Sequence, residues 1–240
     1  MAREAWSNES VDVMIGGVSN EGLILGYWFG VLIDFKAINI LQDPKYFAPL
    51  IETGYKVDDP RSVEFGKMLK QVYYGCTEPS KSNTEGYFFY AGDYYFWHGL
   101  QRVAQIRASR AKGKTYFYRL DIVTKMNFFK SFSKMDHYPG TGHGEDLIYL
   151  FHGTYQDPPA IGSIEFENIK KCVDIFTTFA INGDPNCKSC GDVWTPMESA
   201  ELPIKVLNIA TEKNEFIELP ETERLAVWNK IYEDAGLDLY

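Results

Sequence analysis

The sequence predicts an α/β fold in which a mostly parallel sheet is flanked by helices. Short β-branched or aromatic segments alternate with long segments whose apolar residues recur every three or four positions. Gly113 ends the helical pattern of residues 87–111, and the strand-like segment 115–122 follows directly. A helix, a glycine and a strand in this order make up the second half of a parallel-sheet unit.

The first elements carry clear boundary signals. Residues 11–15 form a short segment rich in β-branched residues and are followed by Gly16-Gly17, which predicts a buried strand ending in a turn. Asp59 is placed to cap a helix whose first turn contains Pro60. One apolar face of that helix is then predicted from the spacing of Phe65, Met68, Leu69, Val72 and Tyr73.

Later segments continue the alternation. In the helix over 87–111, an inward stripe of Phe96, Leu100, Val103 and Ala104 leaves the polar residues outside it, namely Arg102, Gln105, Arg107 and Arg110. A helix is predicted over 164–181, with Ile169, Cys172, Val173, Phe176 and Ala180 inward. Residues 203–210 and 215–219 predict a two-stranded turn-back, and residues 222–234 a last helix.

Composition and charge limit the class of protein. A chain of 240 residues with 45% hydrophobic and 15% aromatic residues suits a single globular domain or a large piece of one. The net charge of -9, without a block of Lys and Arg, argues against a nucleic-acid partner. The apolar run within residues 22–35 is interrupted by Asp34 and is too short to span a membrane. The N-terminus lacks the apolar run of a signal peptide, which favours a cytoplasmic location if Met1 is the true start and leaves secretion open if the chain is a fragment.

Four cysteines are too few for a disulfide scaffold of this length. The Cys187-x-x-Cys190 pair lacks two further zinc ligands nearby and lies in a loop rich in Gly, Pro, Asn and Lys. We therefore expect a surface loop, with a local disulfide left open, and we expect neither a metal nor a cofactor.

A first candidate for chemistry is Glu21, which follows the first predicted strand in a glycine-flanked turn. A carboxylate there can reach across the sheet toward another loop, because reactive residues gather at the carboxyl ends of strands. The segment alone also fits a helix start, with Ser19 or Asn20 as the cap and Glu21 favouring the positive end of the helix dipole.

A second candidate is His143, which lies between Gly142 and Gly144 and so has an accessible imidazole. Its ordinary pKa suits it to take a proton from a nucleophile and return it to a leaving group. His98, His137 and His152 lack this setting and are predicted to be structural.

A histidine base needs a carboxylate to fix its tautomer, and Glu21 could supply it. In α/β hydrolases the chain order is nucleophile, acid, histidine, so the nucleophile should precede Glu21. No Gly-x-Ser-x-Gly turn occurs anywhere in the sequence; the nearest approach, residues 17–21, has glutamate where the second glycine belongs. A glycine-rich loop for an oxyanion hole is also absent from the sequence.

Five segments, in order, resemble the C-terminal part of type-B carboxylesterases, most of all the insect α-esterases. They are residues 15–22 (IGGVSNEG), 114–121 (KTYFYRLD), 142–151 (GHGEDLIYLF), 179–186 (FAINGDPN) and 194–196 (WTP). The resemblance implies that the chain is the C-terminal portion of an α/β-hydrolase fold, with residues 1–240 forming one partial domain. It also implies that Glu21 is the acid and His143 the general base of a serine esterase triad.

The family resemblance implies hydrolysis of small apolar carboxylic esters without a cofactor, in a protein whose nucleophile half lies outside this chain. The aromatic residues at 27–29 and 87–97 would help to line the gorge and acyl pocket. The chain alone is expected to be inactive, and its cut sheet to expose an edge that favours aggregation. The alternative is a non-catalytic binding or adhesion relative of the same fold.

Overall fold

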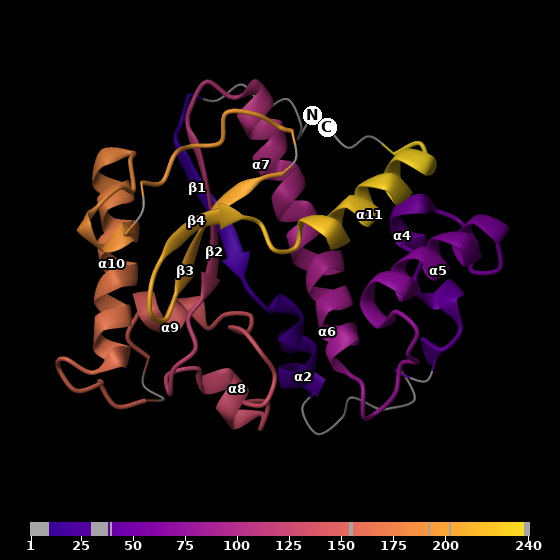
Figure 1. Cartoon of the computed structure of the whole chain (residues 1–240), viewed down its shortest axis with the longest axis horizontal. Helices are drawn as coiled ribbons and strands as arrows, with labels where there is room; N and C mark the ends of the chain where they lie inside the picture. Colours follow the sequence, from indigo (N-terminus) through magenta and orange to yellow (C-terminus); the bar gives the residue numbers. More distant parts are fainter. Residues whose placement is uncertain are drawn as a thin grey trace.

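The structure, a computed structural model, describes residues 10–29, 38, 40–153, 156–191, 193–201 and 203–237. One sheet runs through its centre (Figure 1), with strands in the order β1 (Val13–Val18), β2 (Thr115–Asp121), β3 (Lys205–Ala210) and β4 (Glu215–Glu218). β1, β2 and β3 are parallel, and β4 turns back antiparallel on β3. Within the described parts of the chain, the other edge of β1 has no neighbouring strand. The predicted mostly parallel sheet is therefore confirmed.

Helices cover both faces of this sheet. Alternate side chains of β2 point to opposite faces, so successive residues pack against helices on opposite sides. Tyr116, Tyr118 and Leu120 pack in one apolar cluster with Cys172 and Ile175 of α10 (Ile164–Asn182). The intervening Phe117 packs in another cluster with Trp97 and Ala104. Figure 1 shows α10 on one side of the sheet and α6 and α7 on the other. Residues 116–118 and 120 are apolar or aromatic on both sides of the strand because both faces of the sheet are covered.

The helical pattern predicted over 87–111 is a continuous helical rod made of three parts: α6 (Glu85–Gly92), the π-helical turn η3 (Asp93–Trp97) and α7 (His98–Arg110). The prediction that Gln105 and Arg107 lie outside the buried stripe is wrong. Arg107 is 1% exposed and donates to the carbonyl of Val11 at 2.7 Å, and Gln105 donates to the carbonyl of Ala200 at 2.6 Å. Both polar groups are buried because neighbouring segments offer backbone acceptors.

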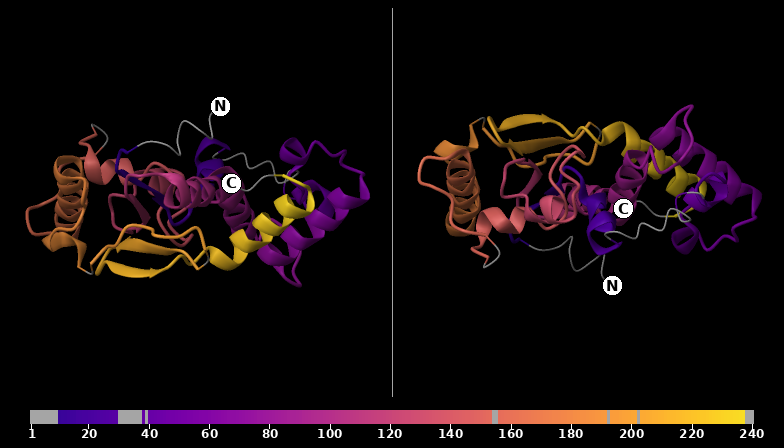
Figure 2. Two further views of the ribbon diagram at one scale, coloured as in Figure 1. Left: turned by 90° about the horizontal axis from the view of Figure 1, so that it is seen from above. Right: turned by 90° about the horizontal axis from the view of Figure 1, so that it is seen from below.

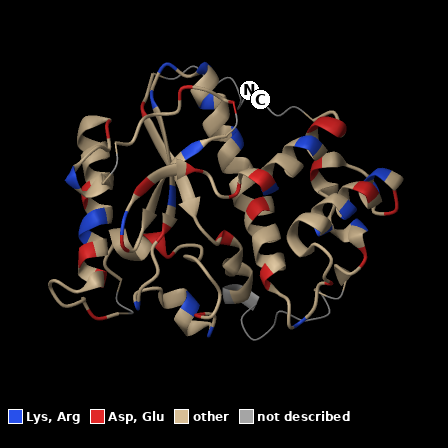
Figure 3. Cartoon of the chain, in the orientation of Figure 1, with Lys and Arg blue, Asp and Glu red and all other residues tan. Residues whose placement is uncertain are grey.

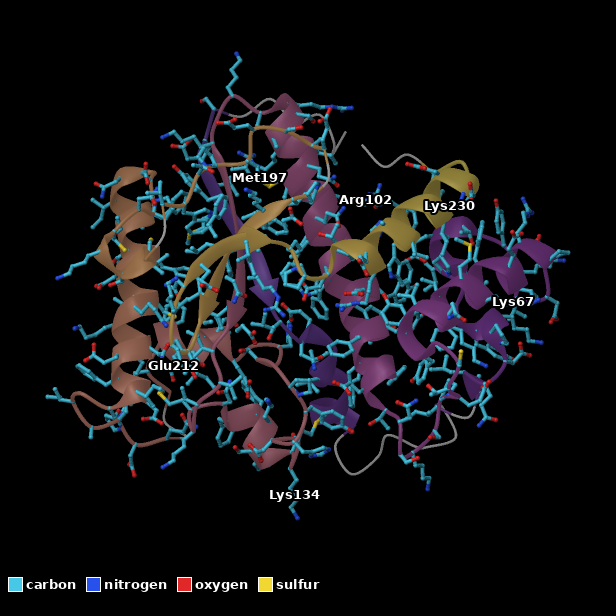
Figure 4. The ribbon with its side chains drawn as sticks, viewed as in Figure 1. Lys67, Arg102, Lys134, Met197, Glu212 and Lys230 are labelled. Atoms are coloured by element: carbon cyan, nitrogen blue, oxygen red, sulfur yellow. The ribbon has the colours of Figure 1, made fainter. Side chains whose placement is uncertain are left out.

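A helical layer lies beyond α6 and α7 (Figure 2), built from η2 (Pro44–Phe47), α4 (Leu50–Thr53), α5 (Pro60–Tyr74) and α11 (Thr222–Asp234). Asp59 caps α5 as predicted, accepting the N–H of Arg61 at 2.9 Å. The bounds of α11 agree with the predicted helix 222–234. Arg102 of α7 lies beside α11 (Figure 4), with its guanidinium 5.0 Å from the ring centre of Tyr232.

The predicted end of the first strand at Gly16-Gly17 is wrong, because β1 continues through both glycines, and Gly16 lies so close to Tyr118 of β2 that a Cβ atom would overlap its carbonyl oxygen. The other predicted elements are present with small changes. α10 begins after Ser163, whose hydroxyl accepts the N–H of Phe166. Its buried face differs from the predicted one, because Ile175 is buried and Ala180, predicted to point inward, is exposed. The turn-back of β3 and β4 is confirmed. Lys and Arg are interspersed with Asp and Glu over several elements (Figure 3). Among the described residues, every helix is too short or too polar to cross a membrane.

Candidate active site

Glu21 stands directly beyond the carboxyl end of β1, in the one-turn 3-10 helix η1 (Glu21–Leu23). Glycines make this position possible. A Cβ atom on Gly22 would overlap the carbonyl oxygen of Phe88 in α6, and a Cβ on Gly17 would lie 2.8 Å from Oε1 of Glu21. η1 can therefore pack against α6, and the carboxylate can fold back over β1, only because both residues lack a side chain.

The alternative interpretation of this segment as a helix start is correct in position, since Asn20 is the N-cap residue of η1 and Glu21 lies in its first turn, but the side-chain cap is absent. Asn20 precedes η1, yet its side chain makes no capping hydrogen bond and instead donates to the carbonyl of Pro139 at 3.0 Å. The Ser19 hydroxyl donates to Asp121 at 2.6 Å and accepts the N–H of Thr141 at 2.8 Å. Both side chains serve to join this turn to another loop rather than to start a helix.

His143 lies in the loop between α8 (Phe128–Phe132) and α9 (Asp146–Leu150), so it does not follow a strand directly as Glu21 does. The loop returns to the sheet edge through a parallel bridge between Gly142 and Asn20, whose N–H donates to the carbonyl of Thr141 at 2.9 Å. Segments 122 residues apart in sequence are therefore held side by side at the carboxyl ends of β1 and β2.

Two buried charged side chains fix the histidine loop from beneath. The carboxylate of Glu145, fully buried, accepts the N–H groups of Gly142 and Lys130 and the side-chain amide of Asn127 at 2.7–3.0 Å. The ammonium of Lys130, 1% exposed, donates to the carbonyls of Tyr138 and Gly140 at 2.8 and 2.7 Å. Each charge is compensated by loop backbone, so the loop conformation is defined by groups that would be costly to leave unpaired.

The structure brings the two predicted site residues into direct contact. Nδ1 of His143 lies 2.6 Å from Oε2 of Glu21, and the other carboxylate oxygen accepts the N–H of Val18 at 2.9 Å. The Glu21 side chain is 7% exposed and the His143 side chain 38%. Because Glu21 occupies Nδ1, the accessible nitrogen of the ring is Nε2, the arrangement of an acid–histidine pair that serves a nucleophile.

Electrostatics at the pair favour the protonated imidazole. The hydrogen bond to Glu21 raises the pKa of His143 above its ordinary value of 6.5, and partial burial opposes this shift. Asp146, at the start of α9, adds a second negative charge nearby, and its own pKa is raised by burial and by the charge of Glu21. The carboxylates thus stabilise the imidazolium that forms when a histidine base accepts a proton.

We expect Glu21→Gln to lower the pKa of His143 in this chain, because the variant removes the largest cause of the upward shift. The pKa is measured from the imidazole chemical shifts in an NMR titration, with Glu233→Gln on the exposed surface of α11 as the control. The pKa of His143 is higher in the folded chain than its value of 6.5 in the unfolded chain, so the pair with Glu21 adds to the free energy of unfolding. This contribution is fully present below pH 6.5 and is lost as the pH rises through the folded pKa. An unchanged titration in Glu21→Gln would contradict the pairing.

An open cleft of about 490 Å³ adjoins the pair. Gly16, Gly17, Glu21, His143, Gly144 and Asp146 form its polar part, and Tyr95, Phe96, Gly99, Leu100 and Leu147 its apolar part. The ring of Phe96 lies 4.7 Å from that of His143, centre to centre. Of the aromatic residues expected to line a gorge, Tyr95 and Phe96 line this cleft, whereas Phe88 and Trp97 are core residues. The side chains of residues 27–29 lie outside the described parts.

The remaining histidines and the cysteine pair singled out in the sequence do not line the cleft beside Glu21 and His143. His98 is buried between helices and donates from Nε2 to the side-chain oxygen of Asn229 at 3.1 Å, and burial lowers its pKa to about 4. His137 is exposed. Within the described ranges, no group of three His, Cys, Asp or Glu residues is arranged to hold a metal ion. The expected surface loop at Cys187 and Cys190 is only partly correct, because Cys190 is 1% exposed and packs in the core beside Trp194.

The sequence-based interpretation missed the residues that support the pair, namely Ser19, Asp121, Asn127, Lys130 and Glu145. A single signal was available for them. Glu145 and Asp146 follow the histidine within the largely apolar segment 142–151, and acidic side chains in such a segment are buried only when they are paired. Their partners lie up to 122 residues away in sequence, which local patterns cannot reveal.

Comparisons with known proteins bear on the family and the fold of the chain. The sequence profile of the Carboxylesterase family matches residues 1–228. Esterase B1 of Culex pipiens is 35% identical over 237 residues, which cover 97% of this chain and 43% of that protein. The crystal structure of juvenile hormone esterase from Manduca sexta, with OTFP covalently attached, superposes with a TM-score of 0.70 at 20% identity and covers 92% of this chain and 41% of its own. The chain thus spans less than half the length of these relatives and has the α/β-hydrolase fold.

Proposed function

The chain belongs to the carboxylesterase family, and from that premise we propose that it supplies Glu21 and His143 to the catalytic triad of a carboxylic ester hydrolase. The observation that carries the proposal is the 2.6 Å hydrogen bond between the buried Glu21 carboxylate and Nδ1 of the partly exposed His143. An acid that fixes one ring nitrogen while the other faces an open cleft is what serine ester hydrolysis requires of these two residues.

In this mechanism His143 takes the proton of a serine hydroxyl through Nε2 as the oxygen attacks the ester carbonyl. Glu21 holds the ring and stabilises the imidazolium, which then protonates the departing alcohol. A water molecule, deprotonated by the same nitrogen, releases the acid from the acyl-enzyme. The apolar lining contributed by Phe96, Leu100 and Leu147 supports an apolar ester as substrate.

The serine must come from elsewhere, because the 240 residues contain no Gly-x-Ser-x-Gly turn. We propose that residues 1–240 are the C-terminal part of one longer catalytic domain, whose remaining part carries the serine and the oxyanion-binding amides. Two observations support this: the chain covers 43% of Esterase B1, and β1 has an edge without a partner strand among the described residues. The chain on its own is then inactive.

The proposal is tested by labelling the native protein with a fluorophosphonate, which reacts with activated serines, and measuring its intact mass after capture with an antibody against the C-terminal peptide. We expect a labelled species of about twice the 27.5 kDa of this chain. The purified 240-residue chain should remain unlabelled and should not turn over an aryl ester. An unlabelled native species of 27.5 kDa, or turnover by the isolated chain that His143→Ala abolishes, would contradict the proposal.

A further inference from the structure

The loop after α10 brings two thiols together. Cys187 precedes the 3-10 turn η4 (Lys188–Cys190), and the N–H of Cys190 donates to the carbonyl of Cys187 at 3.1 Å. This turn places the two sulfur atoms 3.6 Å apart. Cys187 is partly exposed, whereas Cys190 is buried and donates its S–H to the carbonyl of Pro185 at 3.0 Å. The Cys187 thiol is therefore accessible to a reagent, and the buried Cys190 thiol lies next to it.

Contacts on both sides hold this turn in place. The hydroxyl of Ser189, between the two cysteines, donates to Asp174 of α10 at 2.6 Å. The carbonyl of Ser189 accepts the side-chain amide of Asn214, next to β4, at 2.9 Å. Asn186 binds the backbone of Trp194 through both its amide nitrogen and its oxygen, at 2.8 and 2.7 Å. The proximity of the sulfur atoms is thus built into the fold, so a bond between them costs little additional ordering.

We propose that Cys187 and Cys190 form a thiol modification site, which a low-molecular-weight disulfide such as glutathione disulfide oxidises to an intramolecular disulfide. The Cys187 thiolate attacks one sulfur of glutathione disulfide and forms a mixed disulfide, and one glutathione leaves. The Cys190 thiolate then attacks Sγ of Cys187, and the second glutathione leaves. The two thiol protons end on the two released glutathione molecules, and the two electrons lost by the cysteines reduce the reagent.

The order of attack follows from the settings of the two thiols. Burial raises the pKa of Cys190 to about 12, so its thiolate is scarce and shielded until the mixed disulfide forms beside it. The other cysteines lack such a neighbour: Cys172 is fully buried in α10, and Cys76 lies on the surface after α5. Cys76 should therefore stop at the mixed disulfide, and Cys172 should not react in the folded chain.

This site is separate from the proposed ester chemistry, since neither cysteine lines the cleft at Glu21 and His143. Oxidation joins residues that are already adjacent in the folded state and restricts the unfolded chain, so we expect Tm to rise by about 3 °C. The titration of His143 should stay the same. Neither readout depends on ester hydrolysis, so this proposal and the esterase proposal can fail independently.

The test uses the Cys76→Ser chain, reduced and then exposed to glutathione disulfide, with intact mass and peptide mapping as readouts. We expect the loss of two hydrogen atoms and a peptide that contains both cysteines in linked form. In the same Cys76→Ser background, Cys190→Ser should instead gain one glutathione at Cys187, and Cys187→Ser should remain unmodified. The Cys76→Ser result stands by itself if the buried Cys190→Ser variant folds poorly. A folded Cys76→Ser chain that stays fully reduced, or that accumulates only the mixed disulfide, would overturn the proposal.

Discussion

In the longer esterase proposed above, we expect Glu21→Gln to lower kcat/KM by about 10³- to 10⁴-fold, the scale seen when the acid of a serine triad loses its charge. Glutamine fits the same space but cannot stabilise the imidazolium that forms when His143 takes the serine proton. His143→Ala removes the base itself and should cost at least as much. Initial rates on an aryl ester, measured across pH, give both effects.

The pH profile separates this role from simple damage to the fold. His143 must be neutral to accept a proton, and Glu21 raises its pKa above 6.5. We therefore expect kcat/KM to rise with pH through that raised pKa, and the rise to move to lower pH in Glu21→Gln. His137→Ala, on the exposed part of the same loop, and Glu233→Gln on α11 should leave the profile unchanged. Activity in Glu21→Gln close to that of the wild type would refute the assignment of the acid.

Local signals in the sequence were enough to predict most elements. Asp59 and Pro60 define the start of α5, and helix 222–234 was predicted with the bounds that α11 has. The prediction failed where burial depends on distant backbone. Arg107 is buried because its guanidinium donates a hydrogen bond to the carbonyl of Val11, 96 residues earlier. Periodicity describes one face of a helix, but it cannot show which loop covers that face.

The site was predictable to a similar extent. His143 could be selected from its glycine-flanked loop, whereas Glu21 fitted a helix start equally well until the family resemblance was considered. What joins them is a parallel bridge between Asn20 and Gly142, and no property of either segment indicates the other. Lys130 looks like a surface residue in the sequence, yet its ammonium is buried because two loop carbonyls bind it.

The second large effect concerns stability and a buried ion pair that joins three helical elements. Asp93 in η3 is 1% exposed and accepts hydrogen bonds from Arg224 of α11 at 2.7 and 3.3 Å and from the hydroxyl of Tyr73 in α5 at 2.6 Å. That hydroxyl also accepts from Trp228 at 2.7 Å. Asp93→Ala removes the nearest carboxylate from the Arg224 guanidinium, which is 25% exposed and keeps only Glu221, at 3.9 Å, as a carboxylate partner. We therefore expect a loss of about 3 kcal/mol in the free energy of unfolding, the lower end of the range for a broken buried ion pair. Urea unfolding followed by tryptophan fluorescence measures it.

The matched control is Asp234→Ala, which removes a carboxylate that pairs with Lys230 at 2.9 Å on the exposed surface of α11. Water screens that pair, so the loss in the free energy of unfolding should stay below about 1 kcal/mol. Burial raises the pKa of Asp93, although Arg224 and the Tyr73 hydroxyl both oppose this shift. The double variant Asp93→Leu/Arg224→Met should therefore be more stable than Asp93→Ala, because it removes both charges and keeps the volume. If it were less stable than Asp93→Ala, the charge left behind would not be the cause, and the hydrogen bonds of Tyr73 and Trp228 would have to account for the loss.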